Sequence, residues 1–261
     1  MIDDAIPAAT ILLLRDEPAF EVLMIERHAN IKFAGGAMVF PGGRIDSADS
    51  DPRWRDHCAG VKIVDANQIV PRIAAIREAY EETGILFARS DDGSMLSGDG
   101  AAKFNHERGI VEQDAARFFE LVRDNKLILA IEALHLYARW APPKAAQHRR
   151  YDTWFFAAKA PSGQIAVEDG NEATASTWTT PDAVLKSFAA GECKMIFPTV
   201  RNLELLNRSH SASDVFSLAA ERKIEKVEPW VIERDGKHII CIPSDLGYPV
   251  TEELLETAFR S

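Results

Sequence analysis

The stretch REAYEETGI, residues 77–85, decides the fold and raises the first question about this chain. In a helix of 3.6 residues per turn, Glu78, Glu81 and Glu82 fall on one face, because their spacing is i, i+3 and i+4. Like charges at that spacing repel each other. Gly84 follows at once, and glycine is the residue that most often ends a helix. The stretch therefore predicts a helix that concentrates carboxylates on one face and then stops.

Two interpretations of this acidic face are open from the residues alone. It is either a solvated helix surface, on which Arg77 pairs with Glu81 at i+4, or the site of a hard divalent cation. Mg²⁺ prefers oxygen ligands and is commonly held by carboxylates together with substrate phosphates. The five fixed letters of R-E-x-x-E-E-x-G are expected by chance about once in several thousand chains of this length. This rarity favours the metal site.

Composition limits the class of protein. The chain has 261 residues, of which 46% are hydrophobic, and a formal net charge of -10. These values predict a packed core and argue against bulk nucleic-acid binding. Cys58, Cys193 and Cys241 are far apart and form no CxxC pair, which fits a reducing, cytoplasmic location rather than a disulfide framework. The apolar run near the N-terminus stops at Leu14 and has no basic residues before it, so we expect neither a signal peptide nor a membrane span. A homodimer is left open.

Strands and helices are mixed without regular βα alternation, which predicts an α+β fold. The helix that contains the acidic face is expected over residues 67–84. We expect a further amphipathic helix over 110–126, a loop over 88–100, and a last helix from Thr251. "AMVFPGGRID" predicts a strand that ends in a Pro-Gly-Gly turn. The other expected elements are strands in 8–16, 20–28, 133–143 and 149–161, helices in 180–191 and 198–208, and a hairpin in 229–243.

The acidic stretch resembles the Nudix box, G-x5-E-x7-R-E-U-x-E-E-x-G-U with U apolar, of the Nudix hydrolases. Its C-terminal half is intact from Arg77 to Ile85. Its N-terminal half departs, because Gly43 lies 34 residues before Arg77 where the family has 14, so about twenty residues are inserted. The family glutamate is matched only by Asp49 when counted from Gly43, and by Ile69 when counted back from Arg77.

Sequence on either side of the box extends the resemblance. "RHANIKFAGGAMVFPGG", residues 27–43, is similar to the signature of Nudix coenzyme A diphosphatases, with Lys32 in place of the second arginine. Glu172 lies six residues before Trp178, a spacing at which many Nudix proteins have a late glutamate. "WAPP" at 140–143, "RRYDT" at 149–153 and "LGYP" at 246–249 resemble a longer branch that also has an insert in the box.

The resemblance implies an α/β/α sandwich with a mixed sheet, formed as a single domain over 1–261 with an insert at 47–67 and a C-terminal extension at 222–261. It also implies Mg²⁺ or Mn²⁺ as cofactor, and a set of site residues. The implied metal ligands are Gly42, Glu78, Glu81, Glu82 and Glu172. The implied catalytic residues are Glu81, Glu172 and Arg77, with Arg77 bracing the carboxylates. The implied substrate-binding residues are Arg27, Lys32, Arg149 and Arg150.

The implied reaction is metal-dependent hydrolysis of coenzyme A or an acyl-coenzyme A to 3′,5′-ADP and (acyl) 4′-phosphopantetheine. Two alternatives remain at this point. One is a Nudix hydrolase of another pyrophosphate, such as NADH, ADP-ribose, a nucleotide sugar or a capped RNA end. The other is a non-catalytic Nudix module, which the intact glutamates argue against.

Overall fold

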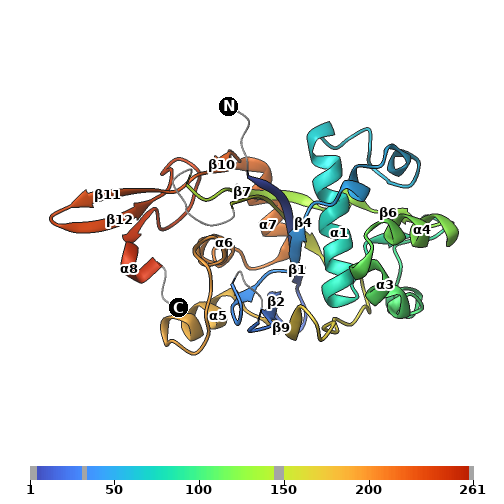
Figure 1. Cartoon of the computed structure of the whole chain (residues 1–261), viewed down its shortest axis with the longest axis horizontal. Coiled ribbons are helices and arrows are strands. Elements are labelled where there is room, and N and C mark those ends of the chain that lie inside the picture. The colour runs from blue at the N-terminus through green and yellow to red at the C-terminus, as the bar shows by residue number, and fades with distance from the viewer. Residues whose placement is uncertain (1–4, 31–33, 144–149, 259–261) are drawn as a thin grey trace.

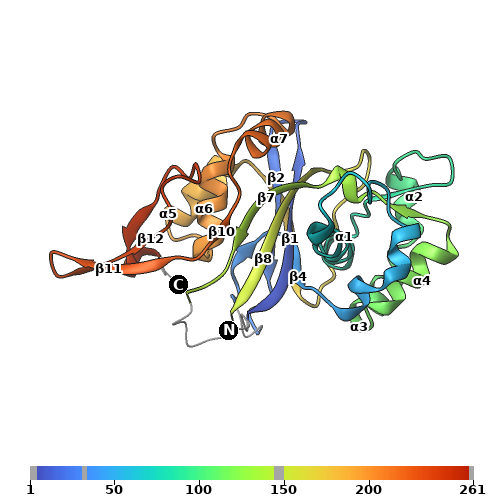
Figure 2. The same cartoon turned by 90° about the horizontal axis from the view of Figure 1, so that it is seen from above.

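The computed structural model describes residues 5–30, 34–143 and 150–258. A mixed sheet lies between two layers of helices, and a smaller sheet extends from one side (Figures 1 and 2). The helices are α1 Ile69–Thr83, α2 Gly98–Ala102, α3 Arg108–Gln113, α4 Ala116–Asp124, α5 Pro181–Ala189, α6 Phe197–Leu206, α7 Ala212–Glu221 and α8 Leu255–Ala258. The strands are β1 Ile6–Arg15, β2 Glu21–Arg27, β3 Met38–Val39, β4 Gly42–Arg44, β5 Ala88–Arg89, β6 Ile128–Leu129, β7 His135–Trp140, β8 Tyr151–Lys159, β9 Ala173–Thr179, β10 Lys226–Val227, β11 Trp230–Arg234, β12 Lys237–Cys241 and β13 Glu252–Leu254.

The main sheet has the order β10-β7-β8-β1-β2-β3, with β4 also paired to β1 and β9 to β2. β1 and β8 run parallel along their whole length, whereas the β7–β8, β1–β2 and β2–β9 pairs are antiparallel. Such a mixed sheet between helical layers confirms the predicted fold class. The segment at 173–179, for which the sequence reasoning expected no strand, brings Glu172 to the end of β2.

Both faces of the central strand β1 are buried, which explains its unbroken apolar run. Ile11 and Leu13 pack toward α1, while Leu12 and Leu14 pack toward α6 and α7. Successive side chains of a strand point to opposite faces, so one run of leucines and isoleucines supplies two separate cores. Figure 2 shows the corresponding layers, with α1 to α4 on one side of the sheet and α5 to α7 on the other.

Helix α1 forms as the local sequence predicts. Pro71 lies in its first turn, where its missing N–H breaks no hydrogen bond. Gly84 ends the helix in the left-handed conformation (φ 74°), and its N–H donates to the Tyr80 carbonyl. The buried face includes Ile73, Ile76 and Tyr80. α1 therefore ends abruptly, two residues after the last of its three glutamates.

The single helix expected over 110–126 is wrong, because two helices, α3 and α4, occupy this segment. Asp114 between them is extended (φ -146°, ψ 98°), and its carboxylate accepts the N–H of Ala116. Aspartate competes with the helical backbone for hydrogen bonds in this way, so the residue ends one helix and caps the next. The loop expected over 88–100 is also interrupted, by β5 at its start and by the first residues of α2.

The Pro-Gly-Gly turn is likewise a strand, since β4 pairs with β1 over Gly42–Arg44. Gly42 has φ 155°, and a Cβ at this position would come within 2.5 Å of the Ala9 carbonyl oxygen. Glycine is required here by close backbone packing instead of by a turn.

The C-terminal segment forms a second, three-stranded sheet. β11 and β12 form the predicted hairpin around Asp235–Gly236. The helix expected from Thr251 is wrong at its start, because residues 252–254 pair with β12 as β13, and the helix begins at Leu255, with Ala258 as the last residue that the structure describes. Pairing with the free edge of β12 overrides the local helical preference. Among the described residues, we find no helix with the length and apolar character that crossing a lipid bilayer requires.

Candidate active site

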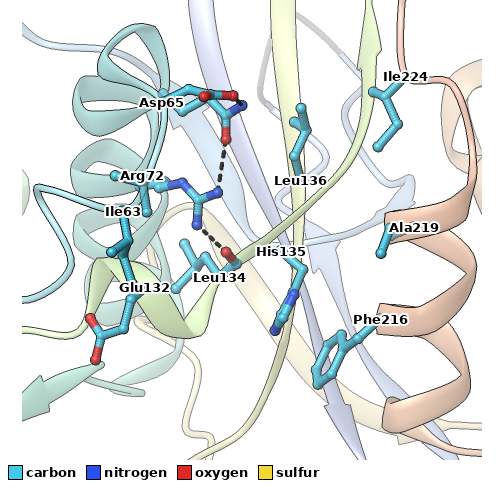
Figure 3. Close-up of a pocket in the computed structure, with 13 residues that line it drawn as sticks. Ile63, Asp65, Arg72, Glu132, Leu134, His135, Leu136, Phe216, Ala219 and Ile224 are labelled. Atoms are coloured by element: carbon cyan, nitrogen blue, oxygen red, sulfur yellow. Dashed lines mark hydrogen bonds between the residues drawn. The ribbon is translucent and has the colours of Figure 1, made fainter.

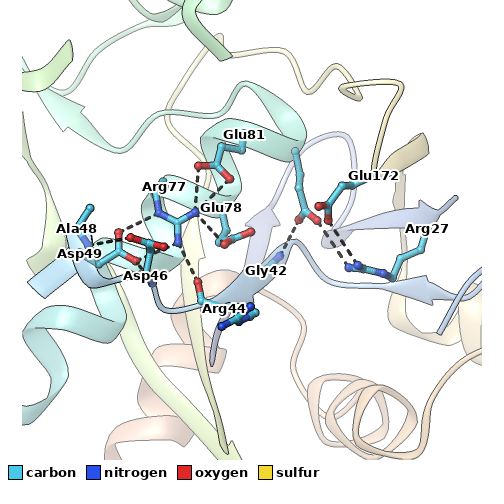
Figure 4. Close-up of polar contacts among 11 residues, drawn as sticks. Arg27, Gly42, Arg44, Asp46, Ala48, Asp49, Arg77, Glu78, Glu81 and Glu172 are labelled. Carbon is cyan, nitrogen blue, oxygen red and sulfur yellow. Dashed lines mark hydrogen bonds and ion pairs between the residues drawn. The ribbon is translucent and has the colours of Figure 1, made fainter. Parts of the chain in front are cut away.

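The three glutamates of α1 are buried, which contradicts the interpretation of a solvated helix face. Glu78 and Glu81 are each less than a tenth exposed, and Glu82 is 2% exposed. Buried carboxylates cost free energy unless cations or hydrogen bonds compensate them. Two arginines supply positive charge to this cluster, one on each side of the helix face (Figure 4).

Arg77 is at the centre of a closed set of ion pairs. Its Nε and Nη2 donate to the two oxygens of Asp49, each at 2.9 Å. Its Nη1 donates to Glu78 at 2.9 Å and to Glu81 at 3.0 Å, and Nη2 also donates to the Arg44 carbonyl. Arg77 is 4% exposed. The guanidinium thus braces two of the α1 carboxylates and does not reach outward.

Asp49 is a residue whose importance the sequence reasoning left open. It is 1% exposed and lies in a short 3₁₀ helix, Ser47–Ser50, where it also accepts the N–H of Asp46. Counting from Gly43 had pointed to Asp49 and counting back from Arg77 to Ile69. The structure brings Asp49 to Arg77 across 28 residues of sequence.

The two glycines of β4, Gly42 and Gly43, lie against two carboxylates of α1, those of Glu82 and Glu78. The N–H of Gly42 donates to Glu82 Oε2 at 2.7 Å. A Cβ on Gly43 would come within 2.5 Å of a Glu78 carboxylate oxygen. The backbone of β4 can approach α1 this closely because Gly43 has no side chain.

On the far side, Arg27 contacts two carboxylates loosely. Its Nη1 lies 3.8 Å from Glu82 Oε1, and its Nη2 lies 3.5 Å from Glu172 Oε2. Arg27 Nε and Glu82 Oε1 are both buried and have no hydrogen-bond partner within the described parts of the chain. Arg27 and Glu82 therefore retain unused hydrogen-bonding capacity.

A turn before β9 holds Glu172, and the sequence reasoning missed the residue that forms it. Asp169 Oδ1 accepts the N–H groups of Asn171, Glu172 and Ala173 at 2.5, 2.8 and 3.1 Å. The Asn171 amide donates to Glu112 of α3 at 3.1 Å, which ties the turn to the helical layer. An Asp two or three residues before the candidate glutamate is the type of residue that builds such turns, and this was the available signal.

The pKa values of the α1 carboxylates are raised. Burial raises the pKa of Glu78 to about 8, against the opposing charge of Arg77. Burial also raises the pKa of Glu81, again opposed by Arg77. For Glu82, burial and then the charge of Glu78 raise the pKa well above its usual value, while Arg27 and the Gly42 N–H lower it. Burial therefore disfavours the charged form of these carboxyl groups, and Arg77 and Arg27 offset this effect only in part.

The other predicted substrate-binding residues are elsewhere or outside the description. Arg150 is buried, and its Nε and Nη2 donate to the Pro142 carbonyl at 3.1 and 3.0 Å, with Glu228 at 3.8 Å. These contacts join the start of β8 to the segments at 142 and 228. Lys32 and Arg149 lie outside the described residues.

A cavity of about 350 Å³ opens at the other end of α1, between that helix, β7 and α7 (Figure 3). Its walls include Ile63 and the Arg72 guanidinium, and His135 stacks on Phe216 with ring centroids 4.0 Å apart. The cavity is lined by none of the predicted site residues, so we do not assign the pyrophosphate to it.

The donor set suits a hard divalent cation. Carboxylate and carbonyl oxygens are the ligands that Mg²⁺ and Mn²⁺ prefer, and Glu82 Oε1 is a buried acceptor without a hydrogen bond. In the part of the chain that is described, no three His, Cys, Asp or Glu side chains converge around one point. Instead, the carboxylates face Arg77 and Arg27, so a cation would draw them away from those arginines.

Comparison with known proteins identifies the class. The fold is similar to that of a Nudix hydrolase from Alicyclobacillus acidocaldarius, with a TM-score of 0.70 and 24% identity over 83% of this chain and 97% of that one. A family model, the NUDT19 Nudix domain, matches residues 62–206, and the chain belongs to this family. It is a Nudix hydrolase, an enzyme acting on phosphorus-containing acid anhydrides.

Two relatives refine the comparison. The acyl-coenzyme A diphosphatase NUDT19 of Xenopus laevis is 25% identical over 90% of this chain and 73% of its own length. The human protein of the same name is 26% identical, over 93% of this chain and 76% of its own length. The resemblance to the coenzyme A diphosphatase branch is thereby confirmed. Nudix hydrolases generally use divalent metal ions.

Proposed function

We propose that the protein is a metal-dependent diphosphatase of coenzyme A or acyl-coenzyme A, which it hydrolyses to 3′,5′-ADP and the (acyl) 4′-phosphopantetheine. The observation that carries this proposal is the cluster of buried carboxylates on α1, against the glycine backbone of β4, in a chain aligned over most of its length with acyl-coenzyme A diphosphatases. The small-molecule substrate, the cytoplasmic location and the absence of bulk nucleic-acid binding belong to the same proposal. A homodimer stays a prediction.

In this proposal Mg²⁺ or Mn²⁺ is held by Glu78, Glu81, Glu82, Glu172 and the Gly42 carbonyl. When bound, such an ion neutralises the pyrophosphate and lowers the pKa of a water molecule. Glu81 or Glu172 accepts the proton of the attacking water. Both are candidates, since Glu81 is braced by Arg77 and Glu172 lies on a turn at the edge of the cluster.

The arginines have different tasks in the proposed reaction. Arg77 is a positioning residue, because all the partners of its guanidinium belong to the protein interior. Arg27 is the proposed phosphate-binding residue, because no described residue accepts a hydrogen bond from its Nε and guanidinium groups match the geometry of phosphate oxygens. Lys32 completes the proposed phosphate contacts on the basis of the sequence signature alone. Arg149 and Arg150 stay predicted substrate-binding residues on the basis of the sequence alone; the guanidinium of Arg150 also donates to the Pro142 carbonyl.

The test is a comparison of substrates at fixed Mg²⁺ or Mn²⁺, with products read by mass spectrometry. We expect a higher kcat/KM for coenzyme A and short acyl-coenzyme A than for NADH, ADP-ribose or a nucleotide sugar. Coenzyme A should also exceed dephospho-coenzyme A, since the two differ only in the 3′-phosphate. A preference for NADH or ADP-ribose would remove the coenzyme A assignment and leave the hydrolase assignment intact.

A further inference from the structure

Arg27 stands between two carboxylates that the proposed function assigns to a metal ion. Its guanidinium lies 3.8 Å from Glu82 Oε1 and 3.5 Å from Glu172 Oε2. Charge-assisted hydrogen bonds between arginine and carboxylate are normally about 2.7–2.9 Å long. These contacts are therefore long and weak, and among the described residues Arg27 Nε and Glu82 Oε1 have no hydrogen-bond partner.

The backbone places Arg27 at this point firmly, even though its side chain is held weakly. A β-bulge lies between Glu26 and Arg27 where β2 pairs with β9. The next residue, His28, donates its N–H to the Glu172 carbonyl at 2.8 Å. The extra residue is Thr174 of β9, because Glu26 pairs with Ala175 and Arg27 with Ala173. A bulge redirects the side chains of its own strand, so the start of β9 is built to bring Glu172 beside Arg27.

We propose that Arg27 is an exchangeable counter-ion of the metal site. Without metal it neutralises Glu82 and Glu172; when a divalent cation binds these carboxylates, the guanidinium leaves them and meets a phosphate of the substrate. This inference rests on the proposed function, since it takes these two carboxylates as metal ligands.

Electrostatics favours the exchange at Arg27, whose contacts with the proposed ligands are long, whereas Arg77 is held in place by Asp49 as well. A divalent cation within coordination distance of Glu82 and Glu172 would lie a few Å from the guanidinium, where like charges repel strongly in a partly buried site. A phosphate then offers Arg27 a new anionic partner of matching geometry. Metal binding would thus prepare the residue that binds substrate.

The test uses Mn²⁺ alone, titrated into the protein and followed by the electron paramagnetic resonance of the free ion. Arg27→Gln removes the competing charge and should bind Mn²⁺ about tenfold more tightly than wild type. Arg27→Lys keeps the charge and should remain close to wild type. The titrations are made at pH 7.5 and at pH 8.5 so that proton release from the carboxylates is separated from the effect of Arg27.

The same Arg27→Gln protein should show a higher KM for coenzyme A. Tighter metal binding combined with weaker substrate binding is the signature of an exchangeable counter-ion, because simple loss of structure weakens both. Unchanged or weaker Mn²⁺ binding by Arg27→Gln overturns the inference. If Arg27→Gln does not fold, Arg27→Met, which keeps the aliphatic stem, is measured in its place with the same two outcomes.

Two further variants distinguish a failure of this inference from a failure of the proposed function. Glu82→Gln should lose most Mn²⁺ binding; if it binds Mn²⁺ as wild type does, the metal assignment itself fails. Arg234→Gln is the charge-matched control, since Arg234 pairs with Glu252 on the exposed C-terminal sheet. It should bind Mn²⁺ as wild type does.

Discussion

Two arginines face the same acidic helix, and they differ in how they are held. Arg77 makes short hydrogen bonds to three carboxylates and is almost completely buried. Arg27 lies 3.5 and 3.8 Å from its two carboxylates, and its Nε has no hydrogen-bond partner in the part of the chain that the structure describes. The difference shows that two arginines beside one acidic cluster can have different roles. Arg77, with its many hydrogen bonds, holds the helix in place, whereas Arg27, with its long contacts, is able to change partners.

The largest effect should come from removing a hydrogen-bond partner of Arg77. Asp49→Ala removes the partner of two Arg77 nitrogens and leaves a buried charge undercompensated, which should lower the free energy of unfolding by about 4 kcal/mol. The measurement is chemical denaturation without metal. Asp124→Ala is the control, because Asp124 forms an exposed pair with Arg123 and such pairs contribute little to stability. A loss no larger than that of the control would show that Asp49 does not brace Arg77.

The next largest effect should be a loss of activity when either Glu81 or Glu82 is replaced. Glu81→Gln and Glu82→Gln should each lower kcat by a hundredfold or more, on the order of 3 kcal/mol of transition-state stabilisation. Steady-state kinetics with coenzyme A measures this. Glu82→Gln should not destabilise the metal-free protein, because it removes the repulsion between Glu82 and Glu78, whereas Glu81→Gln also gives up an ion pair with Arg77. Near wild-type turnover by both variants would refute the role of the helix.

The pH dependence of the free energy of unfolding reports the burial of the α1 carboxyl groups. The pKa of Glu78 is raised from 4.5 to about 8, so the folded state binds this proton more tightly than the unfolded state. Its stabilising contribution is complete below pH 4.5 and is lost as the pH rises through about 8. The free energy of unfolding of the metal-free protein should therefore fall between pH 5 and pH 8, by on the order of 2 kcal/mol.

A half-buried glutamate outside α1 needs a control in that experiment. Burial raises the pKa of Glu204 to about 7, against the charge of Arg201, which gives a slope of the same sign. Glu204→Gln should remove only its own part of the slope. A stability that is constant or increases from pH 5 to pH 8 in this variant would contradict the assignment to α1.

The smallest effect should come from the turn that presents Glu172 beside Arg27. Asp169→Ala removes an acceptor of three backbone N–H groups and should lower kcat/KM by about tenfold, on the order of 1–2 kcal/mol. Asp169→Asn keeps an acceptor oxygen and should restore most of the activity. If the alanine and asparagine variants are equally impaired, the turn is not what positions Glu172.

The sequence predicted most of helix α1 and many of the helices and strands around it. The α+β class and the family follow from short patterns whose meaning is local, whereas the order of the strands in the sheet and the strand at 173–179 were not predicted. The exceptions are instructive: Asp114 breaks a helix that periodicity predicted, and residues 252–254 form a strand at the edge of β12. In both cases a hydrogen-bonding partner competed with the helical backbone.

By itself, the sequence determined the acidic helix, its end at Gly84 and the crowding of three glutamates on one face, because these depend on residues within two turns of each other. Only the tertiary structure decided that Asp49 meets Arg77, that Asp169 shapes the turn of Glu172, and that Arg150 binds the interior. When an insertion separates two residues, the number of residues between them does not predict how far apart they lie in the folded molecule. Pairings between distant segments depend on packing and on the need to compensate buried charge, and these exist only in the folded molecule.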